Sequence, residues 1–276
     1  MEAVKNQPVT GDYAGDLKQI AEAVVSARTL VDQALAHIKK VSSTEKGLSP
    51  ALLDEQQLAC YETSFCVADL SATEALLNYT QQVLERDELS GWVACQFGSE
   101  ALKAVAGRLL ARPADYGLTM ASICASFEVF DNSGIASHYL SAKIMAALGR
   151  QLIDREGDFL PSNLDSEKEL IRDTFRRFAT EVVMPLAEDI HRQDIDIPES
   201  ILQPLREMGC FGISIPERFD GLQPDAGDDS LYMILVTEEL SRGSLGAAGS
   251  LITRPEILAR ALMKGGTDAQ RQKWLP

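Results

Sequence analysis

Apolar residues in this chain recur at spacings of three and four over long stretches. Because an α-helix completes a turn every 3.6 residues, such a spacing places the apolar side chains on one face of a helix. Strands instead need an alternation of period two, and we find only a strand-like piece at residues 213–216. The sequence therefore predicts an all-α protein built from amphipathic helices.

The first half of the chain carries four such apolar stripes. They predict helices over about 16–41, 51–84, 92–109 and 123–148. The pair Ser90-Gly91 is expected to mark a break before the third helix, and Asn132-Ser133-Gly134 to kink the fourth. Four stripes joined by short loops are typical of an antiparallel bundle. Segment 156–165 contains Gly, Pro and Ser, so we predict one domain over 14–155 and a second over 166–276.

The second half opens with Ser166 and Glu169, which have the spacing of a capping box. The apolar residues that follow predict a helix, and Pro185 is expected to kink or end it because proline lacks a backbone donor. Further helices are expected over 199–208, after Pro198, over 230–241, and from Thr267, which forms a second capping box with Gln270.

Charge excludes some partners. Asp and Glu number 41 against 26 Lys and Arg, which gives a net charge of −15. That field repels a phosphate backbone and an anionic membrane surface, so no nucleic acid partner is expected. No segment reaches the roughly 18 apolar residues of a membrane span, and the start lacks a secretory signal. The cysteines form no C-x-x-C pair and the histidines no H-x-x-x-H pair, so we expect a cytoplasmic protein without a metal site.

Two local patterns have plain structural interpretations. Gly243, Gly246 and Gly249 lack the spacing of a nucleotide-binding loop, so they are expected to let another segment approach closely. Adjacent residues on a helix point about 100° apart, so Glu238 and Glu239 should not act as a catalytic pair. One of the two carboxylates is expected in an intramolecular salt bridge. Three aspartates, Asp225, Asp228 and Asp229, predict a solvated acidic loop rather than a calcium site.

Arg254 interrupts a stretch of small and apolar residues. A guanidinium among apolar side chains is costly unless a carboxylate neutralises it. The residues alone leave two interpretations open. Either Arg254 reaches solvent or pairs with Glu256, or it binds an anionic ligand.

Five segments of the second half follow one another in the order and spacing of a known family. They are FATEVVMPLA at 178–187, LREMG at 205–209, GISIPE at 212–217, EELSR at 238–242 and GTDAQRQKWLP at 266–276. Together they resemble the N-terminal helical domain of the acyl-CoA dehydrogenases. Two departures, Pro204 and Phe219-Asp220-Gly221 in place of Y-G-G, concern local geometry.

The resemblance implies the N-terminal portion of an FAD-dependent acyl-CoA dehydrogenase. In that family a β-domain with much of the flavin contact and a C-terminal bundle with the catalytic glutamate come later in the chain. We therefore expect the catalytic glutamate beyond Pro276, assign no flavin ligand, and expect these 276 residues alone to be inactive. The resemblance also implies electron-transfer flavoprotein as electron acceptor and a homo-oligomer.

The family places the acyl end of the substrate pocket near residues 246–254. By this resemblance Gly249, Ser250, Thr253 and Arg254 are the candidate substrate-binding residues, and Arg254 would meet a carboxylate at the far end of the acyl chain. A dicarboxylyl-CoA such as methylsuccinyl-CoA is the expected substrate. A non-catalytic helical scaffold that retains only this domain is the alternative.

The first half contains its own resemblance. ACQFGSEA at 94–101 looks like the A-K-x-F-A-S-E-A segment of the family's C-terminal bundle, and residues 69–79 resemble the helix before it. One hypothesis is that residues 14–155 are a degenerate copy of that bundle. The alternative is a chance match between alanine-rich helices.

Overall fold

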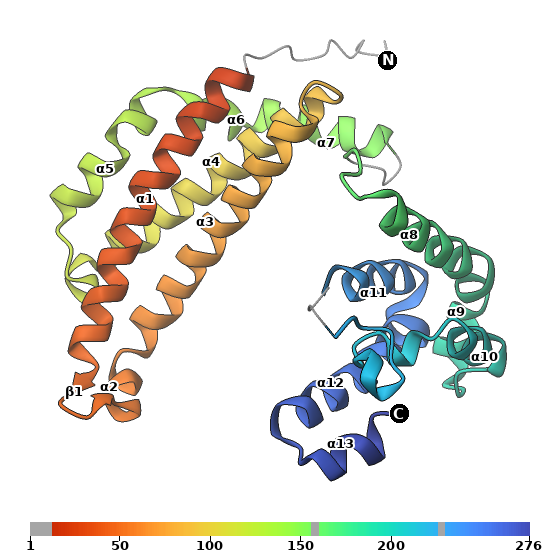
Figure 1. Cartoon of the computed structure of the whole chain (residues 1–276). Helices are drawn as coiled ribbons and strands as arrows, with labels where there is room; N and C mark the ends of the chain where they lie inside the picture. Colours follow the sequence, from red (N-terminus) through yellow and green to blue (C-terminus); the bar gives the residue numbers. More distant parts are fainter. Residues whose placement is uncertain (1–12, 156–159, 226–229) are drawn as a thin grey trace, which may run out of the picture. The chain divides into compact units, whose positions relative to one another are not determined.

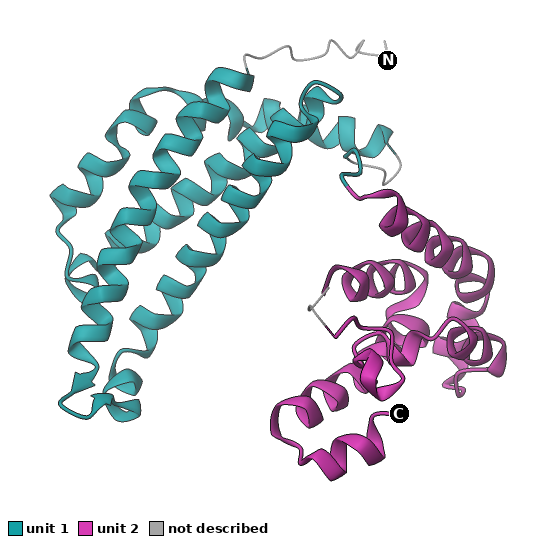
Figure 2. Ribbon diagram, viewed as in Figure 1, with its two compact units in different colours: residues 1–163 teal, residues 164–276 magenta. Residues whose placement is uncertain are grey.

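The computed structural model describes residues 13–155, 160–225 and 230–276. These residues are overwhelmingly helical, which confirms the all-α prediction. The chain divides into two compact units, Met1–Asn163 and Leu164–Pro276 (Figure 2). Each unit has its own hydrophobic core. None of the helices in the described ranges combines the length and apolarity that a bilayer span requires.

The first unit contains a bundle of helices and several further elements (Figure 1). The bundle helices are α1 (Tyr13–Val41), α3 (Gln57–Val83), α4 (Glu88–Ala111) and α5 (Met120–Asn132). The further elements are β1 (Ser43–Thr44), β2 (Gly47–Leu48), α2 (Pro50–Glu55), η1 (Pro113–Tyr116), α6 (Ile135–Tyr139) and α7 (Ala142–Asp154). Strands β1 and β2 pair antiparallel as a small hairpin.

Helices α1, α3, α4 and α5 pack against one another in the expected four-helix arrangement. Helix α1 packs against α3, α4 and α5, and α4 packs against α3 and α5. The predicted stripe of α1 is buried at Ile20, Val24, Ala27, Val31 and Ile38. Its remaining member, Leu35, is exposed. The packing agrees with a bundle, whereas descent from a duplicated C-terminal bundle stays a prediction.

The first of two predicted interruptions in this unit is wrong, and the second is more complete than predicted. Ser90-Gly91 lies inside α4, and the chain breaks earlier, before the cap residue Asp87. Gly91 is needed for close packing, because a Cβ there would lie 2.8 Å from Leu84 and 3.0 Å from Tyr13. Asn132-Ser133-Gly134 ends α5 instead of kinking it, since Gly134 adopts φ +80°. The predicted fourth helix is therefore three helices, α5, α6 and α7.

Asp87 fastens the start of α4 to the end of α7. Its carboxylate accepts a hydrogen bond from the backbone N–H of Leu89 at 3.0 Å and two from Arg155, at 2.6 and 2.8 Å. The Arg155 hydrogen bonds, helped by the Leu89 N–H, lower the pKa of Asp87. One side chain thus caps a helix and neutralises a cation at the same time.

We expect Asp87→Ala to lower the free energy of unfolding by about 2 kcal/mol at neutral pH, since it removes a cap and an ion pair. Because the folded-state pKa lies below the unfolded one, this contribution is present above the unfolded pKa and is lost as pH falls through the folded pKa. Urea unfolding at neutral and acidic pH measures it. Asp32→Ala, at an exposed position of α1, is the control, and an equal loss in both variants contradicts the assignment.

The second unit is a compact set of shorter helices. They are α8 (Ser166–Phe178), α9 (Met184–Gln193), α10 (Glu199–Glu207), α11 (Ser230–Ser244), α12 (Ser250–Gly265) and α13 (Asp268–Trp274). Two π-helical turns join consecutive helices, η2 (Ala179–Val183) between α8 and α9 and η5 (Leu245–Gly249) between α11 and α12. Two 3-10 turns, η3 (Cys210–Gly212) and η4 (Glu217–Phe219), lie in the segment between α10 and α11.

The helix ends of this unit follow the sequence with one correction. Pro198 immediately precedes α10, Gly209 follows its end with φ +72°, and Thr267 and Gln270 form the predicted capping box. The cap of α8, however, is Asp165, whose carboxylate accepts from Lys168 N–H at 2.9 Å. Its neighbour Ser166 is already helical.

The predicted strand piece at 213–216 is wrong. These residues form a turn, and pairing is limited to a single parallel bridge between Pro216 and Gln223. The two isoleucines that suggested a strand are buried in different places. Ile213 lies in the main core of the unit, and Ile215 packs against a smaller cluster that contains Phe219. The spacing of two between these apolar residues therefore does not require a β-sheet.

Candidate functional site

The predicted substrate-binding residues lie where α11 turns through η5 into α12. The Ser244 hydroxyl accepts from Ala247 N–H at 3.1 Å and caps the turn. Small side chains are needed here, because a Cβ on Gly249 would lie 2.2 Å from Ser241 Oγ. A Cβ on Gly243 would lie 3.1 Å from Ala179. The expectation that these glycines allow close approach is confirmed for Gly243 and Gly249, whereas a Cβ on Gly246 would meet nothing within 4 Å.

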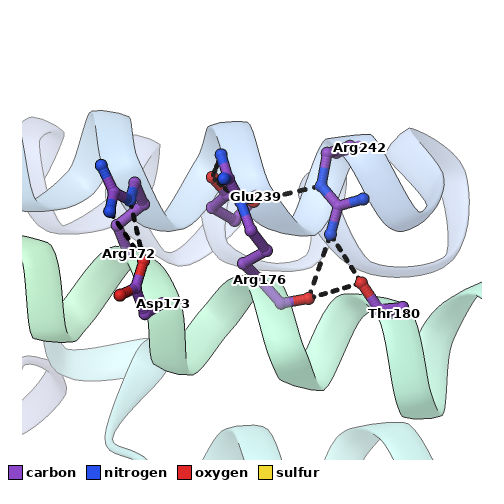
Figure 3. Close-up of polar contacts among 6 residues, drawn as sticks. All are labelled: Arg172, Asp173, Arg176, Thr180, Glu239 and Arg242. Carbon is purple, nitrogen blue, oxygen red and sulfur yellow. Dashed lines mark hydrogen bonds and ion pairs between the residues drawn. The ribbon is translucent and has the colours of Figure 1, made fainter. Parts of the chain in front are cut away.

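A buried carboxylate fixes α11 against α8 (Figure 3). Glu239 is 2% exposed, and its oxygens accept hydrogen bonds from Arg176, at 2.8 and 3.1 Å, and from Arg242, at 3.2 Å. Arg242 also donates to the backbone oxygen of Arg176 at 3.1 Å and to Thr180 Oγ1 at 2.7 Å. The predicted intramolecular salt bridge is therefore confirmed for Glu239. Its neighbour Glu238 is exposed on another side of α11.

The four predicted site residues do not converge on one point. Gly249 is buried in the turn. Ser250 and Thr253 donate to backbone oxygens of their own segment, Ser250 Oγ to Gly246 O at 3.0 Å and Thr253 Oγ1 to Ser250 O at 2.9 Å. Arg254 is exposed, and among the described residues it has no hydrogen-bond or ion-pair partner.

Of the interpretations left open for Arg254, the exposed position agrees with the one in which the side chain reaches solvent. The apolar residues that follow it, Ile257 and Leu258, are themselves 69% and 57% exposed, so they do not enclose the guanidinium. Nor does Arg254 pair with Glu256, because Glu256 accepts from Arg260 at 2.8 Å, one turn further along α12. Arg254 thus reaches solvent and is available to an external anion.

An open groove of about 570 Å³ lies between α11 and α12. Of the predicted site residues, Thr253 lines it. Its other lining residues are Ser230, Met233, Ile234, Thr237, Glu238, Glu256 and Arg260. The groove is largely apolar along α11, with the Glu256–Arg260 pair on its α12 side.

A second hollow, of about 940 Å³, was not found from the sequence. It lies between α12 and the segment that follows η3, and its lining includes three basic residues, Arg218, Arg260 and Lys264. Arg218 pairs with Asp225 at 2.6 Å. Arg260 and Lys264 are one turn apart on α12, whereas Arg218 is distant in sequence and joins them only because the 213–223 segment folds back, so no local motif could have revealed all three.

The second unit corresponds to a known domain. Residues 165–276 match the acyl-CoA dehydrogenase N-terminal domain. This part of the chain therefore belongs to the acyl-CoA dehydrogenase family, as its motifs indicated.

The particular relatives extend this result. The chain is 33% identical over 282 residues to (2S)-methylsuccinyl-CoA dehydrogenase of Cereibacter sphaeroides, a match that covers 98% of this chain and 49% of that protein. Matches to 3-(aryl)acrylate reductase of Clostridium sporogenes (33% over 110 residues) and glutaryl-CoA dehydrogenase of Desulfococcus multivorans (29% over 114 residues) cover 40% and 41% of this chain. They cover 28% and 29% of those proteins. The chain thus spans about half the length, or less, of the curated relatives that it matches.

Proposed function

We propose that this chain serves as the N-terminal part of an FAD-dependent acyl-CoA dehydrogenase acting on a dicarboxylyl-CoA such as methylsuccinyl-CoA. The observation that supports it is the alignment with (2S)-methylsuccinyl-CoA dehydrogenase, which covers 98% of the chain and so includes the helical unit before the family domain. Matches limited to about 110 residues include both a reductase and a dehydrogenase, so the domain alone does not define the reaction.

In the proposed reaction a carboxylate would remove an α-proton from the thioester, and a bound flavin would supply the acceptor for the β-hydride. We assign neither step to a residue of this chain. The grooves of the second unit are open, and the carboxylates that line them, Glu238, Glu256 and Asp225, are exposed or engaged by arginines. Because both grooves are open, neither one encloses a flavin, and we assign no flavin ligand among their lining residues. Electron-transfer flavoprotein as acceptor, a homo-oligomeric state and a cytoplasmic location belong to the same proposal.

Within the proposal, Arg254 binds the distal carboxylate of the acyl group. The support is that Arg254 has no partner among residues 13–155, 160–225 and 230–276 and directly follows Thr253, which lines the groove between α11 and α12. Arginine presents a planar set of donors that matches a carboxylate, and the acyl chain would cover the exposed guanidinium and strengthen the hydrogen bonds.

The test measures dehydrogenation by the full enzyme that contains these residues. For Arg254→Ala we expect KM for methylsuccinyl-CoA to rise about tenfold or more, as loss of a charge-assisted hydrogen bond costs about 1.5–3 kcal/mol. Butyryl-CoA has no distal carboxylate, so its KM should not change. Lys264→Ala, on the same helix but in the other hollow, is the control. An unchanged KM for methylsuccinyl-CoA contradicts the role of Arg254, and absence of acyl-CoA oxidation by the unaltered enzyme contradicts the function.

A further inference from the structure

The chain that leaves the first unit is held against the end of α3. Residues 160–163 have no regular secondary structure, and we call them the strap. The Tyr79 hydroxyl, on α3, donates to the carbonyl oxygen of Pro161 at 2.6 Å. One turn later on the same helix, Gln82 Oε1 accepts a hydrogen bond from the side-chain amide of Asn163. Two side chains three positions apart on one helix face therefore bind the strap at two points.

The strap is the last segment of the first unit. The division between the units falls directly after Asn163 (Figure 2), and the match to the acyl-CoA dehydrogenase domain begins at Asp165. Helix α8 starts at Ser166, with Asp165 as its cap. While the strap is bound, the connection between the two units therefore consists of Leu164 and Asp165, whereas release of the strap would add the whole strap to it.

The groups that make these two contacts are already arranged for binding. Proline has a fixed φ, and the residue before a proline favours an extended backbone, so the strap loses little conformational entropy around Pro161 when it closes. The Gln82 amide nitrogen donates to Asn78 O at 3.2 Å, so the Gln82 carbonyl oxygen remains as the acceptor for the strap. Burial, and then the charge of Asp87, raise the pKa of Tyr79, so its hydroxyl keeps the proton that it donates.

The two contacts differ in exposure, and neither belongs to the core. Tyr79 and Pro161 are half-buried, whereas Gln82 and Asn163 are exposed. Water competes for exposed hydrogen-bonding groups, so the contact between Tyr79 and Pro161 should stabilise the closed strap more than the other. No residue of 160–163, all of which are described, is among the apolar residues of the bundle core. A segment held by a few polar contacts outside a core opens locally, without unfolding the rest.

We propose that the strap is a conformational device that closes on Tyr79 and Gln82 and opens while the bundle stays folded. Closed, it keeps the connection between the units short. Open, it exposes that connection to solvent and lengthens it by roughly 13 Å, since an extended chain spans at most about 3.3–3.6 Å per residue. The strap thereby controls the range over which the two units can move. It precedes the part of the chain that matches the acyl-CoA dehydrogenase domain, so it does not depend on the proposed reaction.

Limited proteolysis of the chain with thermolysin is the test. Thermolysin cuts before leucine and needs a released, extended chain around the bond, so its rate at the bond between Asn163 and Leu164 follows the population of the open strap. Tyr79→Phe removes only the hydroxyl, and we expect it to raise this rate about fivefold, as for loss of one hydrogen bond of ordinary net strength. Gln82→Ala should raise it about twofold, because that contact is exposed.

The matched controls are Tyr61→Phe and Gln81→Ala. Both residues are exposed on α3, and neither has a hydrogen bond to the strap in the described structure. We expect both controls to be cut at the rate of the unaltered chain. Mass spectrometry identifies the products of the cut as residues 1–163 and 164–276. Hydrogen exchange of α1 and α4 should be the same in Tyr79→Phe as in the unaltered chain, because the bundle stays folded when the strap opens.

Two results overturn the proposal. The first is equal cleavage of Tyr79→Phe and Tyr61→Phe, which means that the Tyr79 hydroxyl does not hold the strap. The second is faster cleavage of Tyr79→Phe together with faster hydrogen exchange in α1 and α4, which means that the whole bundle opens and not the strap alone. Neither measurement uses an acyl-CoA, so the strap and the proposed reaction can fail separately.

Discussion

Replacement of Glu239 by alanine is expected to lower the free energy of unfolding of the second unit by about 3 kcal/mol, because it removes the buried partner of two arginines. Glu239 is 2% exposed and accepts from both Arg176 and Arg242. Both arginine side chains are partly exposed, at 46% and 39%, so water would solvate them in part and keep the loss below that of a fully buried pair.

Hydrogen exchange measures this effect by segment. Amides of α8 and α11 should exchange faster in Glu239→Ala, since this carboxylate joins the two helices, whereas those of α1 and α4 should not change. Glu238→Ala is the matched control, because Glu238 is the adjacent residue of the same helix and is exposed. Equal destabilisation by the two variants would show that the Arg176–Glu239–Arg242 contacts contribute little.

Gly221→Ala is expected to destabilise the second unit by roughly 2–3 kcal/mol, because the new methyl group would meet backbone. A Cβ on Gly221 would lie 1.9 Å from the carbonyl oxygen of Ile215. That oxygen accepts from Gln223 N–H at 2.9 Å, and Gly221 N–H donates to Pro216 O at 3.2 Å. Relief of the clash would therefore disrupt the hydrogen bonds that fold this segment back on itself.

Hydrogen exchange of the second unit at increasing urea concentrations measures this change. The amides of Gly221 and Gln223 should lose protection at a lower urea concentration in Gly221→Ala than in the unaltered chain, because both donate within the folded-back segment. Gly246→Ala is the control, because a Cβ at that position meets nothing within 4 Å, and we expect it to be neutral or slightly stabilising. A Gly221→Ala variant as stable as Gly246→Ala would contradict the close approach to Ile215.

The long helices were predictable because each has an apolar stripe that a local pattern reveals. Errors occurred where distant residues decide the outcome. Gly91 suggested a break, yet it lies inside α4, where the absence of a side chain allows Tyr13 of α1 to pack closely. The residues of α4 alone could not have predicted this contact. The cap of α8 is Asp165 and not the predicted Ser166. The sequence did not distinguish these two adjacent residues, because each has a side-chain oxygen that can accept from a helix N–H.

The candidate site was predicted less well than the fold. The sequence predicted a salt bridge for one of Glu238 and Glu239, but the structure was needed to show that it is Glu239 and that its partner Arg176 lies in α8. The sequence left open whether Arg254 reaches solvent, and the structure shows it exposed beside Ile257 and Leu258, which are exposed as well. Residue type predicts burial only when the helix face is known. Asp220, which stands at the first glycine of the family's Y-G-G, adopts φ +64°, the left-handed conformation that glycine favours.

The two π-helical turns, η2 and η5, bear on how this domain tolerates insertions and deletions. A π-helical turn corresponds to one residue inserted into an α-helix. Helix η2 is continuous with its neighbours, because Phe178 before it and Met184 after it are both α-helical, so deletion of one residue within Ala179–Val183 would convert the turn to ordinary α-helix. Helix η5 differs, because Ser244 before it is extended with φ −168°, so α11 and α12 do not form one continuous helix there. The same deletion in the middle of α11 would rotate every later residue by about 100° and move Glu239 or its neighbours off the buried side. Single-residue length variation among relatives within the α8–α9 segment should accordingly concentrate at η2.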